Sequence, residues 1–341
     1  MLGAARATPS RSQPVPASRI PPVPDRSHDH KKGRVVSRND AFRATPAHAR
    51  TATRPAGVPA GHRRLRPLRV PILIVALVII LAGTRELNVL AEHNAALALV
   101  AGFGTALAAL ACYAWLSRTV EGRPAVPELS AAGRWSGLGW GALLGLAAFT
   151  VTMLLIALFG GVRHVYPGSL AGFLVGAGAM ASVAVNEELL FRGVVLRIAE
   201  ERFGTVSALA VSCVVFGLAH LVNPNASVLG AVAIVIQGGI VLGAAYIATG
   251  NLWLAIGFHF AWDVTEGSIF STANSGTNDE PIGLLHTTLS GPTALTGGAF
   301  GPEGGLVAPL VCLLVAFFLL RRAVRAGNLR RRPRPGERAA G

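Results

Sequence analysis

The sequence predicts an all-α polytopic membrane protein in which about eight transmembrane helices enclose a buried polar site. Three properties support this prediction: the composition, the mean hydropathy and a series of apolar segments. Of the 341 residues, 52% are hydrophobic and 14% are charged, whereas soluble domains carry about 25% charged residues. The mean hydropathy is +0.51. These values exclude an ordinary soluble enzyme and a wholly disordered chain.

The two ends of the chain are basic and the part between them is mildly acidic. Residues 1–69 contain fifteen Lys or Arg against three Asp, a net charge of +12, with ten prolines and no apolar period. Residues 321–341 contain eight Arg and one Glu, a net charge of +7, whereas residues 70–320 carry −5. We therefore expect a disordered Pro-rich tail at 1–69, a transmembrane domain at 70–320 and a second basic tail at 321–341.

Eight apolar segments account for the transmembrane domain. A transmembrane helix needs about 20 residues at a rise of 1.5 Å each. The fourth and seventh segments reach this length, ending near 199 and 270, only if they include charged residues. Charged residues inside a span are costly and usually functional, so we expect the chemistry there. The segments are 70–84, 95–116, 137–162, 170–186, 205–222, 226–248, 252–262 and 305–320.

Eight spans place both termini on one side of the membrane. Basic flanks mark the cytoplasmic side, so both termini are expected in the cytoplasm, with attraction to anionic lipid head groups. Basic tails can also bind nucleic acid, but the flanking spans favour the membrane interpretation, and no nucleic-acid partner is expected. Residues 267–304 contain no Lys or Arg and many Gly, Ser and Thr. This composition predicts a flexible loop on the opposite side.

Three polar clusters interrupt the apolar segments. Residues 186–192 read Asn-Glu-Glu-Leu-Leu-Phe-Arg, residues 216–220 read Phe-Gly-Leu-Ala-His, and residues 259–263 read His-Phe-Ala-Trp-Asp. Side chains four residues apart share one face of a helix. An arginine in hydrocarbon needs a partner, and the spacing predicts that Glu188 pairs with Arg192.

Other ionisable side chains of the clusters fall within about two helical turns of one depth, at 1.5 Å per residue. Burying such groups separately is hard to justify energetically. We therefore expect side chains from three helices to converge on one buried site. They are Glu187, His220, His259 and Asp263.

Such a site supports hydrolysis of an acyl bond, with a peptide as the expected case, by two routes. In the first, a carboxylate and a histidine hold and deprotonate water, and a second histidine donates to the developing oxyanion. In the second, Glu187, His220 and His259 hold a divalent metal, Zn²⁺ before others, with an open position for water. Taken singly, each residue also fits a packing role between helices.

The three clusters together resemble the motifs of the CPBP family of intramembrane proteases, which includes the Ras-converting CAAX endopeptidase and the bacterial Abi proteins. That family shows EExxxR, then FxxxH, then HxxxN or HxxxD. Each motif alone is weak, but all three in order, each in its own span, are specific. The resemblance covers about residues 170–270. The motifs read Glu187-Glu188-xxx-Arg192, Phe216-xxx-His220 and His259-xxx-Asp263.

The resemblance implies a role for each motif residue. It assigns activation of water to Glu187 and His220, and stabilisation of the oxyanion to His259 and the residue four positions after it. It assigns a supporting role to Glu188 and Arg192. Members of the family are often called metalloproteases, and a metal-independent glutamate mechanism is also proposed for them.

The last motif ends in Asp263 rather than Asn, and Phe216 is expected to support the site. An ionised Asp accepts hydrogen bonds but cannot donate one to an oxyanion. If the resemblance holds, Asp263 has one of three roles: it carries a proton, it orients His259, or it helps to hold a cation.

The leading hypothesis is an intramembrane endopeptidase that cleaves a lipidated, CAAX-like or other membrane-associated protein or peptide in the cell membrane. The sequence has no HExxH, no GxGD and no GxSG within a span, which argues against other intramembrane protease types. The alternative is a non-catalytic membrane scaffold or bacteriocin-immunity protein that retains the motifs. A third hypothesis, a proton-coupled transporter, is weakened because no internal repeat is evident.

Overall fold

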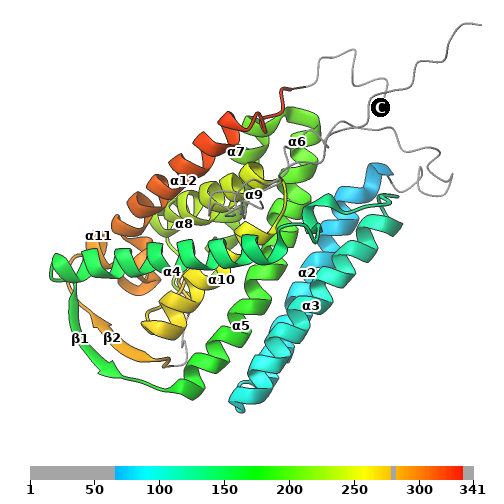
Figure 1. Cartoon of the computed structure of the whole chain (residues 1–341). Coiled ribbons are helices and arrows are strands. Elements are labelled where there is room, and N and C mark those ends of the chain that lie inside the picture. The colour runs from blue at the N-terminus through cyan, green and yellow to red at the C-terminus, as the bar shows by residue number, and fades with distance from the viewer. Residues whose placement is uncertain (1–65, 278–281, 333–341) are drawn as a thin grey trace, which may run out of the picture. The chain divides into compact units, whose positions relative to one another are not determined.

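The computed structural model describes residues 66–277 and 282–332. The tail predicted at 1–69 therefore lies almost entirely outside the described residues. Seven helices of the described part are long and apolar enough to cross a membrane, which confirms the predicted polytopic all-α fold (Figure 1). They are α2 (Arg69–Ala91), α3 (Ala95–Thr119), α4 (Arg134–Leu158), the composite spans Leu170–Phe203, Thr205–Val222 and Val228–Thr249, and α12 (Val307–Arg325).

The three composite spans change helical pitch beside the polar clusters. Two of them contain a π-helical segment, and π-helical turns occur frequently at functional sites. The change of pitch releases backbone carbonyl groups from the regular α-helical pattern, so they can bond side chains. The pieces are α5 (Leu170–Glu188), η5 (Leu189–Leu196) and α6 (Arg197–Phe203); α7 (Thr205–Ala219) and η6 (His220–Val222); and α8 (Val228–Ile234), η7 (Val235–Leu242) and α9 (Gly243–Thr249).

The seventh predicted span is the helix α10 (Trp253–Asp263), extended by the π-helix η8 (Val264–Ile269). At 11 and 6 residues, the two pieces are too short for α10 to count among the seven long spans. All residues of α10 except Phe260 are buried. It lies inside the bundle against α4 and α5 (Figure 1). Neighbouring helices therefore cover almost the whole surface of α10.

Glycines allow α10 and α4 to approach closely. A Cβ atom at Gly141 would lie 2.3 Å from the Leu254 carbonyl oxygen, and one at Gly145 would lie 2.3 Å from the Phe258 carbonyl oxygen. Lipid provides no hydrophobic driving force for helix association, so close van der Waals packing at small residues stabilises such crossings instead. The close crossing fixes the position of α10, which carries the HxxxD motif.

The segment 267–304, expected to be a flexible loop, is folded where it is described. The strand β2 (Leu285–Leu289) pairs antiparallel with β1 (Val162–Pro167), and the helix α11 (Thr293–Thr296) follows. Glu303 is buried and accepts a hydrogen bond from the Trp262 indole at 2.6 Å. We call residues 271–277 and 282–304 the cap. The expectation was wrong because polar groups of this Gly- and Ser-rich segment bond to one another and to α10.

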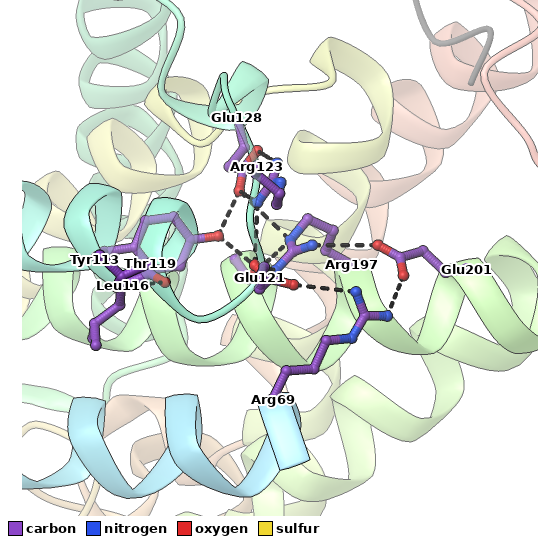
Figure 2. A network of polar contacts seen from close by, with 10 residues as sticks. Arg69, Tyr113, Leu116, Thr119, Glu121, Arg123, Glu128, Arg197 and Glu201 are labelled. Atoms are coloured by element: carbon purple, nitrogen blue, oxygen red, sulfur yellow. Dashed lines mark hydrogen bonds and ion pairs between the residues drawn. The ribbon is translucent and has the colours of Figure 1, made fainter. Parts of the chain in front are cut away.

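A second group of charged side chains joins the start of α2 to α6 and to the connection between α3 and α4 (Figure 2). We call it the ionic cluster. Arg197 Nη2 lies 2.7 Å from Glu121 Oε2, and Arg123 Nη2 lies 2.6 Å from Glu128 Oε2. The Tyr113 hydroxyl group lies 2.5 Å from Glu128 Oε1. Its charged members are Arg69, Glu121, Arg123, Glu128, Arg197 and Glu201.

The start of the first described helix and the end of the last lie at the same end of the bundle. Arg69, the first residue of α2, pairs with Glu201 of α6, and the Thr205 amide donates to the Arg330 carbonyl at 3.1 Å. The start of α2 and the segment after α12 therefore lie on the same side of the bundle (Figure 1). This arrangement is the one expected if α10 acts as an eighth crossing.

Candidate active site

The three motifs line one cavity of about 860 Å³. The EExxxR motif spans the junction of α5 and η5, the FxxxH motif spans the junction of α7 and η6, and the HxxxD motif occupies the last turns of α10. Residues of α2 and of the cap complete the wall. The polar side chains lining this cavity include Glu187, His220, His259, Asp263, Asn274 and Glu303.

Glu188 and Arg192 form the pair expected from their spacing. Arg192 Nη1 lies 2.8 Å from Glu188 Oε1, and both side chains are fully buried. The other terminal nitrogen of Arg192 donates to the Gly238 carbonyl oxygen in η7. The guanidinium also lies over the Phe216 ring, 4.5 Å from its centroid. The charge of Arg192 is thus compensated on three sides, and its partners lie on three different spans. Arg192 does not line the cavity.

His259 has one ring nitrogen fixed by a carboxylate and the other directed toward the cavity residues. Its Nδ1 lies 3.0 Å from Glu188 Oε1, so Nδ1 carries the proton and donates it. Its Nε2 lies 3.4 Å from Asp263 Oδ2 and 3.8 Å from Glu187 Oε2. Glu188 therefore has a second role that the spacing did not reveal: it sets the tautomer and orientation of His259.

Glu187 is the carboxylate without a local cation, as its place on the helix implied. Its side chain is 17% exposed, in contrast to the fully buried Glu188. Its Oε2 atom is buried and has no hydrogen-bond partner among the described residues. A carboxylate that lines a cavity in this state can accept a proton from a small molecule such as water.

Phe216 separates the two imidazoles. Its ring centroid lies 4.7 Å from that of His220 and 6.3 Å from that of His259. His220 Nδ1 lies 2.8 Å from the Phe216 carbonyl oxygen, so Nδ1 is the donor and Nε2 is left as an acceptor. The four-residue spacing of FxxxH thus lets the Phe216 carbonyl orient His220. The Phe216 ring lies between His220 and His259. Phe191 packs edge-on against the same ring.

The cavity also contains polar residues that the motifs did not predict. Glu303 Oε2 accepts hydrogen bonds from the backbone N and the hydroxyl of Ser275, at 3.1 and 2.5 Å. Gln237 Nε2 donates to the Glu303 carbonyl at 2.8 Å. Asn274 lines the cavity beside them. None of these residues belongs to a motif, and only Gln237, inside the predicted span 226–248, gave a signal in the sequence.

The residues predicted to hold zinc are not gathered into a ligand set. Nδ1 of His259 and Nδ1 of His220 are bonded to Glu188 and to the Phe216 carbonyl, which leaves Nε2 of each ring as the nitrogen that would hold a metal ion. Across residues 66–277 and 282–332, no group of three or more His, Cys, Asp or Glu side chains is arranged to hold a metal ion. A zinc ion on Glu187, His220 and His259 stays a prediction.

Comparison with known proteins identifies the motif-bearing segment. Residues 169–265 match the family model for Rce1-like, Type II CAAX prenyl endopeptidase Rce1-like proteins. No curated protein and no solved structure matches the chain. The matched segment begins at the start of α5 and ends just after Asp263, so it contains all three motifs. The resemblance predicted from the motifs is thus confirmed over residues 169–265, which are similar to the Rce1-like, type II CAAX prenyl endopeptidase family, and the seven apolar helices mark the protein as an integral membrane protein.

Proposed function

We propose that this protein is an intramembrane endopeptidase in which Glu187 activates water. One observation carries the proposal: the buried Oε2 of Glu187 has no hydrogen-bond partner in the described structure and lies 3.8 Å from His259 Nε2 in the cavity. The neighbouring Glu188 also has one buried oxygen without a partner, but its Oε1 is paired with Arg192 and His259, as is usual for a buried carboxylate. The match to an endopeptidase family supports the same conclusion.

The reaction is general-base hydrolysis. Glu187 takes one proton from a water molecule while the water oxygen bonds to the carbonyl carbon of the substrate. The carbonyl oxygen becomes an oxyanion beside His259, whose ring is held by Glu188. When the oxyanion collapses, the C–N bond breaks and the proton on Glu187 passes to the leaving amine. His220 Nε2, an acceptor, helps to hold the water.

The expected substrate is a membrane-associated or lipidated peptide of the CAAX type. Support comes from the family match, from the position of two motifs inside apolar spans, and from the position of the third in the buried helix α10. Membrane lipid surrounds the bundle, and we further propose that both termini face the cytoplasm. The described ends of the chain lie at one end of the bundle, and basic flanks mark that side.

The direct test is cleavage of a prenylated peptide with a CAAX-type C-terminus by purified protein. Replacing a general base costs about 10²–10⁴-fold in rate, so Glu187→Gln should lower kcat by that factor. Glu86→Gln is the matched control, because Glu86 is an exposed glutamate of α2 that does not line the cavity. Equal kcat for wild type and Glu187→Gln would refute the proposal.

Metal dependence is tested separately. Metal analysis of the purified protein, followed by chelation and Zn²⁺ re-addition, distinguishes the two hydrolytic routes. Activity that survives chelation supports the route in which Glu187 acts without a metal. Activity lost on chelation and restored by Zn²⁺ supports the ligand set predicted from the motifs.

A further inference from the structure

The cap brings to the cavity one amide group, that of Asn274, whose two N–H donors are not both used by described residues. Asn274 lines the cavity and is only 7% exposed. Its carboxamide interacts with the Asp263 carboxyl group, and its Nδ2 reaches no other acceptor among the described residues. An amide nitrogen carries two N–H donors, and buried donors in folded proteins are almost always paired. The second N–H, in the wall of a cavity, therefore indicates a group that enters the cavity.

The neighbours of Asn274 fix its position without using its side-chain donor. Ser275 is bonded to Glu303 through both its backbone N and its hydroxyl group, and Asn223 Nδ2 donates to the Ser275 carbonyl at 2.7 Å. The Thr277 amide donates to the Asn274 carbonyl at 2.9 Å. Ser275 also has a φ of +49°, a conformation that is costly for a residue other than glycine and recurs at functional sites. The carboxamide is thus held ready for a ligand.

The HxxxD motif lacks a hydrogen-bond donor that its HxxxN form would have. An ionised Asp263 only accepts hydrogen bonds. His259 donates through Nδ1 to Glu188, so only Nε2 is left for the oxyanion, and it donates when the ring is in its imidazolium form. Oxyanion sites commonly provide more than one donor. With Asp263 ionised, a second donor has to come from outside the motif.

We propose that Asn274 supplies this donor, and that its Nδ2 hydrogen-bonds the carbonyl oxygen of the substrate as it becomes the oxyanion. This inference rests on the proposed endopeptidase function and extends the catalytic site beyond the matched segment 169–265. Asp263 then serves as the acceptor that orients His259 and the Asn274 amide. Glu187 still takes the proton from water and returns it to the amine that leaves when the C–N bond breaks.

The test is the kinetics of Asn274→Ala and Asn274→Asp on the prenylated peptide. Loss of one oxyanion donor costs about 10²–10³-fold in kcat, so both variants should lose kcat by that factor, with KM changed by less than about threefold. The melting temperature of Asn274→Ala should stay close to that of the wild type, because the contact with Asp263 is the one side-chain interaction lost. Asn274→Asp adds a buried carboxylate beside Asp263, so it is compared as kcat per folded molecule.

The matched control is Asn223→Ala, which removes a carboxamide from the same region that does have a partner, the Ser275 carbonyl. We expect it to lower the melting temperature and to lower kcat less than Asn274→Ala does. A purely structural role for Asn274 predicts the reverse: a lowered melting temperature for Asn274→Ala and kcat losses that are equal in the two variants.

Rescue provides a second readout. Asp263→Asn introduces an amide donor beside the same position, so the double variant Asn274→Ala/Asp263→Asn should exceed Asn274→Ala in kcat. A cleaving wild type with unchanged kcat in both Asn274→Ala and Asn274→Asp overturns this inference alone. A wild type without Glu187-dependent cleavage overturns the proposed function and this inference with it.

Discussion

The candidate active site and the ionic cluster are both groups of mostly buried carboxylates, but they balance charge differently. In the ionic cluster three guanidinium groups face three carboxylates (Figure 2). In the described part of the candidate site, Arg192 is the one guanidinium paired with a carboxylate, and that carboxylate is Glu188. Glu187 and Asp263 face imidazole nitrogens instead.

This difference separates a structural use of buried charge from a chemical one. Paired charges compensate for their lost hydration but gain little else. Imidazole and carboxyl groups that share protons can move them at neutral pH, which guanidinium groups cannot. The ionic cluster is also tied to the site, because Tyr113 and Arg197 both bond the Gly193 carbonyl, one residue after Arg192. The paired region therefore supports the reactive one.

The largest loss of stability is expected for Glu188→Ala, because this change removes the one carboxylate that pairs with a guanidinium group in the described part of the candidate site. Arg192 would be left as a fully buried cation without a carboxylate, and His259 would lose its orienting partner. Removing one partner of a buried pair costs about 3–5 kcal/mol. Unfolding in mild detergent measures this loss. A variant as stable as the wild type would show that Arg192 is not compensated by Glu188.

Glu128→Gln should be the next most damaging, and it should affect stability rather than chemistry. Glu128 receives hydrogen bonds from Arg123 at 2.6 and 2.7 Å, and bonds to charged groups contribute about 1.5–3 kcal/mol. We expect a loss of about 2 kcal/mol in unfolding free energy, with kcat per folded molecule nearly unchanged. A large fall in kcat at full folding would place the ionic cluster within the catalytic machinery.

Acid should weaken the ionic cluster through the same carboxylate. Burial raises the pKa of Glu128, but the Arg123 hydrogen bond and the charges of Arg197 and Arg123 outweigh it and hold that pKa below its usual value. A lowered pKa in the folded state adds stability above the unfolded pKa of about 4.3, and this stability is lost as pH falls through the folded pKa. The stability difference between wild type and Glu128→Gln should therefore narrow in acid. A difference that stays constant from pH 7 to pH 3 would contradict this.

The smallest effect is expected for Glu201→Gln, at the rim of the ionic cluster. Its side chain is 35% exposed, and it pairs with Arg197 at 3.3 Å and with Arg69. Exposed ion pairs contribute about 0–1 kcal/mol, and added salt screens them. The melting temperature of this variant should differ from wild type by little, and by less at high salt. A loss of stability equal to that of Glu128→Gln would show that solvent exposure does not determine how much these ion pairs contribute.

Sequence reasoning reached the motif residues because helix spacing is local. A separation of four residues suffices to pair Glu188 with Arg192, and intramembrane charge suffices to single out His259. The same reasoning could not reach Asn274 or Glu303, because they come to the cavity through the folding of a loop that has no periodic pattern. It also missed that Glu188 orients His259, since this contact joins different helices and depends on how closely α10 approaches α5.

The length of α10 could not be predicted from the sequence pattern either. An apolar segment with polar residues at its end fits both a complete span and a short helix enclosed by others. Tertiary packing decides between them, here through glycines such as Gly141 and Gly145 that bring α4 against α10. Such contacts leave only a scattered small-residue pattern in the sequence.

The measurement that tests the central claim most directly is single-turnover cleavage in water enriched in ¹⁸O. If Glu187 activates water, the new carboxylate of the product should contain one solvent oxygen, formed at the wild-type rate in Glu86→Gln and about 10²–10⁴-fold more slowly in Glu187→Gln. Product formed without solvent oxygen, or at an equal rate in Glu187→Gln, would contradict the claim that this carboxylate is the general base.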